Sequence, residues 1–143
     1  QVVADRDKIR PQLTKWQRGL LKKAETDHRI MLPLTGQSRT FLGDLGPMKS
    51  EVVNFPVQTT AGNLTLAIQH SVYDRIRAAC PDIKMFLQIY DAIYLDCPPD
   101  KVQTAMSVID HSVGFVIRSG YWARLQQIFK RTVPLKHDVE VWN

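Results

Sequence analysis

Asp91 is the acidic residue best placed for metal chemistry in this sequence. It interrupts KMFLQIYDAIYLDCPP, an apolar, aromatic and β-branched segment that predicts two strands meeting at Tyr90-Asp91. A carboxylate at such a junction is available to a divalent cation, because Mg²⁺ binds carboxylate oxygens and substrate phosphates together. The alternative is a turn aspartate that only hydrogen-bonds its own backbone. Residues 84–97 are therefore predicted to form a hairpin whose turn holds either a metal ligand or a structural aspartate.

Two side-chain amides, Asn54 and Gln58, form the second candidate group. They are four residues apart, so they share one face if a helix continues through Pro56. Pro56 either starts that helix or kinks a longer helix begun near Ser50. Amide groups can donate to the purine N3 and pyrimidine O2 atoms that every base pair presents in the minor groove. Solvated helix polar residues are the alternative interpretation.

Other common catalytic patterns are absent from the sequence. It contains no GxxxxGK[ST] phosphate loop, no HExxH zinc helix and no GxSxG elbow. Cys80 and Cys97 form neither a CxxC pair nor a disulfide framework, which predicts free thiols. The four histidines are too scattered to propose a metal site.

The remaining segments predict an α+β fold with an antiparallel sheet. Apolar residues that recur every three or four positions predict helices, and strict alternation predicts a half-buried strand. The predicted elements are a basic helix within residues 1–30, a hairpin at 31–48 with Gly36 in its turn, a central helix at 50–80, helices at 99–118 and 121–131, and a closing strand at 133–142. His137 is the one exception on the apolar face of that strand.

The net charge of +5 lies entirely in the first third of the chain. Residues 1–50 hold ten Lys/Arg against five Asp/Glu, whereas residues 51–143 hold nine of each. Helical spacing places four of these cations on the outer sides of the first helix, namely Lys15, Arg18, Lys22 and Lys23. Such a stripe suits a polyanion such as nucleic acid, and a solvated basic helix face explains it equally well. No apolar run is long enough for a membrane helix, so we expect no membrane partner and a cytoplasmic location.

Four strings in a fixed order resemble those of family A DNA polymerases, the DNA polymerase I group. They are WQRGLLKKAETDHRIMLPLTGQSRTFLGDL, NFPVQTTAGN, QIYDAIYLDCP and VPLKHDVEVWN. In that family a helix precedes a hairpin with a TLxGRxRxL string, a helix carries NxPxQxTAA, a hairpin carries His-Asp-Glu, and a PLxxxVxxGxNW strand closes the chain. The resemblance covers nearly the whole chain and implies the C-terminal palm segment, with a palm-type antiparallel sheet and packed helices.

The resemblance implies a role for each candidate residue. Asp91 matches the palm aspartate that binds two catalytic Mg²⁺ ions. Asn54 and Gln58 match amides that contact the primer-terminal base pair from the minor groove. Arg39 falls on the basic GRxR string and implies a contact with the DNA backbone. Tyr90 takes the place of the family histidine at the primer terminus, so it is assigned to DNA binding.

Two departures from the family pattern affect primer handling. The family His-Asp-Glu is here Tyr90-Asp91-Ala92, which removes an imidazole and a second carboxylate. The basic residue usually found one turn before the asparagine is here Ser50, next to Lys49. The main metal ligand is retained.

The resemblance also implies parts that this sequence does not contain. The family's DYSQxExR string with the first metal aspartate, and its RxxxKxxxFGxxYG nucleotide-binding helix, belong upstream of these residues. Two-metal catalysis needs carboxylates from both strands, so we expect activity only with an upstream fragment or subunit, on a DNA primer-template with a deoxynucleoside triphosphate. A phage-like origin would place the enzyme in the host cytoplasm. The alternatives are a non-catalytic nucleic-acid-binding module and the palm of a single-subunit RNA polymerase.

Overall fold

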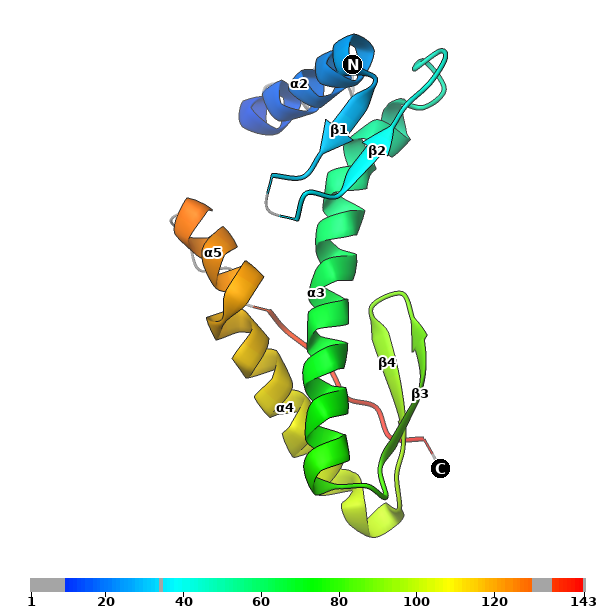
Figure 1. Ribbon diagram of the computed structural model, residues 1–143, viewed down its shortest axis with the longest axis vertical. Coiled ribbons are helices and arrows are strands. Elements are labelled where there is room, and N and C mark those ends of the chain that lie inside the picture. Colours follow the sequence, from blue (N-terminus) through cyan, green and yellow to red (C-terminus); the bar gives the residue numbers. More distant parts are fainter. Residues whose placement is uncertain (1–9, 34, 130–134, 143) are drawn as a thin grey trace. The chain divides into compact units, whose positions relative to one another are not determined.

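The computed structural model describes residues 10–33, 35–129 and 135–142 (Figure 1). The chain divides into two compact units, Gln1–Thr60 and Ala61–Asn143. The elements in chain order are α2 (Pro11–Asp27), β1 (Arg29–Met31), β2 (Ser38–Thr40), α3 (Lys49–Ala79), β3 (Lys84–Ile89), β4 (Ala92–Asp96), the 3₁₀ turn η1 (Pro99–Lys101), α4 (Val102–Arg118) and α5 (Gly120–Phe129).

The first unit begins with α2 and the short β1–β2 hairpin. Pro11 lies in the first turn of α2, where its missing N–H costs nothing, and the helix ends at His28 in a left-handed conformation with φ 51°. The two strands pair antiparallel with Ile30 opposite Arg39. Gly36 has φ 71° in the connecting turn, a conformation that glycine adopts without steric cost. The predicted hairpin is confirmed, with strands that begin two residues earlier and are shorter than expected.

A small apolar cluster holds the first unit together. Its buried members are Ala24, Ile30, Phe41, Leu45 and Val52, and Leu20, Leu21, Met48 and Phe55 pack against them. The rings of Phe41 and Phe55 meet edge to face with centroids 6.3 Å apart. Helix α2, the hairpin and the start of α3 therefore share one core.

Helix α3 is continuous through Pro56, which settles the choice left open by the sequence in favour of the longer helix. Proline cannot donate to the carbonyl four residues earlier, so α3 lacks one hydrogen bond at this point. The hydroxyl of Thr60 donates to the carbonyl oxygen of Pro56 at 2.7 Å. The continuous backbone keeps Asn54 and Gln58 on successive turns of one helix.

In the second unit, the later turns of α3 lie beside α4 (Figure 1). The buried cluster is Val72, Ile76, Ile83 and Ala105. Both cysteines are free, as expected, and both pack against this cluster. The predicted stripe of the central helix is buried only in part, because Val57 remains 58% exposed.

The fold class is α+β, with two separate two-stranded antiparallel sheets in the described residues. The closing strand predicted at 133–142 is not found, since residues 135–142 are irregular, and 133–134 lie outside the described residues. A strand needs a partner for its backbone groups, and no described strand pairs with this segment. The helix predicted at 121–131 is confirmed as α5 as far as Phe129, and residues 130 and 131 lie outside the described residues. No helix in the described ranges is long and apolar enough to cross a membrane.

Ser112 on α4 provides a test of this packing. Its side chain is 0% exposed, and its hydroxyl has no hydrogen-bond partner among the described residues. Because a buried hydroxyl without a partner is unfavourable, we expect Ser112→Ala to raise the free energy of unfolding by about 1 kcal/mol in urea denaturation. Ser107→Ala, at an exposed position of the same helix, is the control and should change stability by less than about 0.5 kcal/mol. A destabilised Ser112→Ala protein would contradict this description of the core.

Candidate functional site

The candidate site is the turn of the β3–β4 hairpin. Ile89 pairs with Ala92, so Tyr90 and Asp91 form a two-residue connection between the strands. Apolar and β-branched residues on both sides favour extended backbone, and Pro98 ends the second strand region. The hairpin predicted at 84–97 is confirmed, with Asp91 in its turn.

Tyr90 holds an unusual backbone conformation. Its φ is 53°, in the left-handed region that favours glycine and that costs an ordinary residue roughly 1–2 kcal/mol. The side-chain amide of Gln88 donates to the Tyr90 carbonyl oxygen at 3.0 Å, which helps to hold the turn. The phenol ring gains nothing from burial, because Tyr90 is 91% exposed. A two-residue hairpin turn requires positive φ at its first residue, where glycine, asparagine or aspartate is usual, so the tyrosine is the exception here.

Asp91 projects from the exposed part of this turn. Its carboxylate is a hard oxygen ligand of the kind that Mg²⁺ prefers. Within the described residues, no three His, Cys, Asp or Glu side chains come together as a metal site. Asp91 by itself would be a single ligand of any cation bound at this turn.

The hairpin around Asp91 exposes an apolar surface. Phe86, Leu87 and Ile89 of β3 are all exposed. The ring of Tyr94 on β4 lies 6.2 Å from that of Phe86 and 6.0 Å from that of Trp142. These aromatic contacts link the C-terminal segment to the hairpin without a strand pairing. Each strand has one edge without a partner in the described residues, and such an edge can pair with another strand.

The two amides of α3 lie in the first unit. Asn54 and Gln58 are both exposed and are separated by about one helical turn. Neither side chain forms a hydrogen bond with another described residue. Their donors are therefore available to an external acceptor, as the minor-groove hypothesis requires.

Arg39 has two partners that sequence analysis missed. Its guanidinium forms an ion pair with Glu51 in the first turn of α3, and it lies over the Phe41 ring at 5.2 Å from the centroid. Both side chains of the ion pair are about half exposed, so the pair is worth at most about 1 kcal/mol. A phosphate could replace Glu51 at little cost. No short-range signal joins these residues, which are twelve positions apart.

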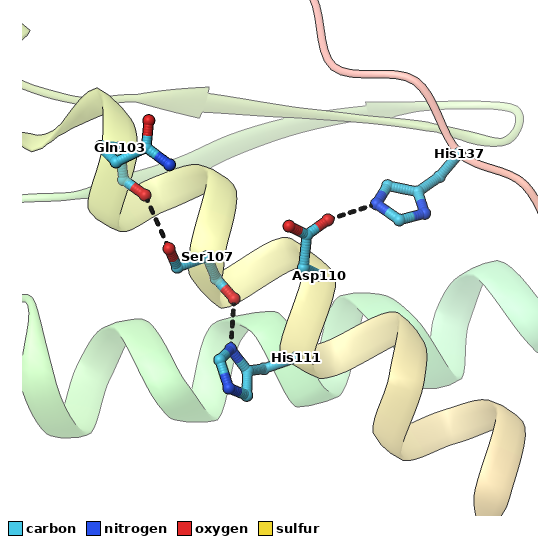
Figure 2. Close-up of polar contacts among 5 residues, drawn as sticks. All are labelled: Gln103, Ser107, Asp110, His111 and His137. Carbon is cyan, nitrogen blue, oxygen red and sulfur yellow. Dashed lines mark hydrogen bonds and ion pairs between the residues drawn. The ribbon is translucent and has the colours of Figure 1, made fainter.

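His137 and His111 both have structural partners on α4 (Figure 2). The Nε2 atom of His137 lies 2.6 Å from Oδ1 of Asp110, so this histidine ties the C-terminal segment to the helix. The Nδ1 atom of His111 lies 2.7 Å from the carbonyl oxygen of Ser107. The histidine among the apolar residues of this segment therefore pairs with a carboxylate.

The structure brings Tyr90 and Asp91 together in the second unit, and it places Arg39, Asn54 and Gln58 in the first. Gln88 and Glu51 are the contacting residues that sequence analysis did not single out. Comparisons with protein-family models, with curated proteins and with solved structures found no match to this chain. The family assignment therefore stays a prediction that rests on the four sequence strings.

The strain at Tyr90 can be measured directly. Glycine adopts positive φ without penalty and the ring is exposed, so Tyr90→Gly should raise the free energy of unfolding by about 1 kcal/mol. Tyr90→Asn should give a smaller gain, because asparagine tolerates this conformation better than tyrosine does. Urea denaturation of the three proteins tests the order. Destabilisation by both changes would mean that the tyrosine ring, not the turn, dominates the local energy.

Proposed function

We propose that this chain is the C-terminal palm segment of a family A, DNA-directed DNA polymerase. The proposal is supported by the order in which the family-like strings fall on structural elements. A basic helix, a hairpin with Arg39, a helix with two amides one turn apart and a hairpin with an aspartate in its turn follow one another. The observation that carries the proposal is Asp91, an exposed carboxylate in a two-residue turn between apolar strands.

In the proposed reaction, the primer 3′-hydroxyl oxygen attacks the α-phosphorus of a deoxynucleoside triphosphate. A phosphodiester bond forms, and the bond between the α-phosphorus and the oxygen that bridges to the β-phosphate breaks. Pyrophosphate leaves, and the hydroxyl proton passes to solvent. Asp91 would hold a Mg²⁺ ion through its carboxylate. Bound Mg²⁺ would supply charge neutralisation for the phosphoryl transfer.

The other candidate residues would position DNA. Asn54 and Gln58 would donate to minor-groove acceptors of the terminal base pair, which tests pair geometry independently of sequence. Arg39 would exchange Glu51 for a backbone phosphate. Tyr90, held at the turn next to Asp91, would contact the primer end. The first metal aspartate would come from an upstream fragment or subunit, because Asp91 alone cannot hold two ions.

A non-catalytic nucleic-acid-binding module is the second candidate. Ala92 stands where the family has a second carboxylate, and the described residues hold no cluster of metal ligands. Under this alternative the basic first unit would still bind DNA, but Asp91 would be a turn residue only. Activity with the upstream segment separates the two functions.

Asp91→Asn is the direct test of catalysis. In a complex with the upstream polymerase segment, this change should lower the rate of nucleotide addition by at least about a hundredfold while primer-template binding is retained, because an amide is a poor ligand for Mg²⁺. Asp96→Asn is the matched control, since Asp96 lies at the far end of β4, opposite Lys84. Near-normal extension by the Asp91→Asn complex would refute the metal-ligand role.

Gln58→Ala tests the minor-groove role. Extension from a matched primer should slow about tenfold, which corresponds to the loss of one hydrogen bond to an uncharged acceptor. The effect should be similar for all four terminal base pairs, because the acceptors are common to them. Gln103→Ala, an exposed glutamine of α4, is the control. A defect limited to one base pair would contradict the proposed contact.

A further inference from the structure

Gly19 lies in the middle of α2 and is surrounded on the helix surface by one tryptophan and three lysines. Residues three and four positions away are the surface neighbours of any helical residue. For Gly19 these four neighbours are Lys15, Trp16, Lys22 and Lys23, and all of them are exposed. We call Gly19 and these four residues the Gly19 patch.

The glycine itself has no structural explanation within the described residues. Apart from proline, glycine is the residue least favourable to a helix interior. A Cβ atom added at Gly19 would meet nothing within 4 Å, so no described contact requires the small residue. Its absent side chain leaves the helix backbone open to close approach from outside, which is one of the established uses of glycine.

The lysines of the patch are available to an anion. Lys15, Lys22 and Lys23 form no ion pair with another described residue. Residues 10–33 hold six Lys/Arg against two Asp/Glu, so the surrounding charge is also positive. Two helical turns separate Lys15 from Lys22, a distance of about 10 Å along the axis. The patch therefore presents separated positive charges rather than one compact anion site.

Nucleic acid fits this surface better than an anionic membrane does. A helix that lies in a membrane buries its apolar face among lipids. In α2 the second half of that face is already used, since Ala24 is buried and Leu20 and Leu21 pack against the core of the first unit. Only Leu13, 38% exposed, and Trp16 remain for lipid contact. Trp16 remains 40% exposed beside the lysines. Lysines next to an accessible aromatic ring are the combination that binds single-stranded nucleic acid, because phosphates contact the charges and a base stacks on the ring.

We propose that the Gly19 patch binds a single strand of nucleic acid. The lysines contact its phosphates, Trp16 stacks on a base, and Gly19 lets the strand approach the helix backbone. The proposal rests on the proposed function in taking DNA as the partner, but it involves none of the residues assigned to the reaction. It adds to the polymerase a strand-binding surface on α2.

The first experiment measures salt-dependent binding of a fluorescein-labelled 20-nucleotide oligothymidylate to the 143-residue chain by anisotropy. Each phosphate contact on a single strand contributes about 0.7 to the slope of log affinity against log salt. The double change Lys15→Gln with Lys22→Gln should therefore make the slope shallower by about 1.4. The control, Lys84→Gln with Lys136→Gln, removes the same charge from exposed positions elsewhere. Equal slopes for the two double variants would overturn the proposal, because net charge alone would then explain binding.

The second experiment separates stability from binding. Gly19→Ala should raise the melting temperature, since alanine favours the helix, and should weaken oligonucleotide binding several-fold by blocking close approach. Trp16→Leu should weaken binding without changing the salt slope. A stabilised Gly19→Ala protein with unchanged affinity would overturn the role of the glycine. The Lys15→Gln with Lys22→Gln protein is also tested on phosphatidylserine vesicles. If it loses vesicle binding while its oligonucleotide binding is unchanged, the partner of the Gly19 patch is an anionic membrane and not a nucleic acid strand.

Neither measurement depends on nucleotide addition, so the two proposals can fail separately. If the Gly19 patch fails these tests, the polymerase proposal still stands on Asp91. If Asp91→Asn extends primers normally, the strand-binding surface still stands on its lysines and glycine.

Discussion

Helix α3 must continue through Pro56 for both apolar clusters to form. Both apolar clusters take side chains from this one helix, Val52 for the first and Val72 with Ile76 for the second. A helix that began only at Pro56 would remove Val52 from its cluster and would separate Asn54 from Gln58. The 31-residue helix is thus a structural requirement and also the element that presents the two amides.

The β3–β4 hairpin combines a strained turn with an incomplete environment. Tyr90 adopts positive φ while its ring is left in solvent, and Asp91 beside it has no partner set of metal ligands among the described residues. The apolar side chains of β3 are exposed as well. The positive φ and the exposed apolar side chains are unfavourable for an isolated domain, and a neighbouring strand would cover the apolar side chains. Under the proposed function, that strand would come from the upstream polymerase segment.

Charge is distributed in a way that agrees with such an assembly. The net positive charge belongs to the first third of the chain, where α2 carries lysines around an open glycine. The remainder of the chain is neutral overall and contains the aspartate turn. Under the proposed function, the cations of residues 1–50 would contact DNA and Asp91 would be a metal ligand, so binding and chemistry would depend on different residues of the chain.

Local sequence patterns predicted the helices at 11–27, 50–80 and 99–118 and the hairpin around Asp91, because helical periodicity and turn chemistry are local properties. It placed Asp91 in a turn and the two amides on one helix face. Tertiary structure alone decided that Arg39 pairs with Glu51 and that His137 pairs with Asp110, 27 residues away. It also decided that residues 135–142 form no strand, although their residues alternate as a strand would. Alternation specifies which face can be buried, whereas a strand forms only where a neighbouring backbone offers its hydrogen bonds.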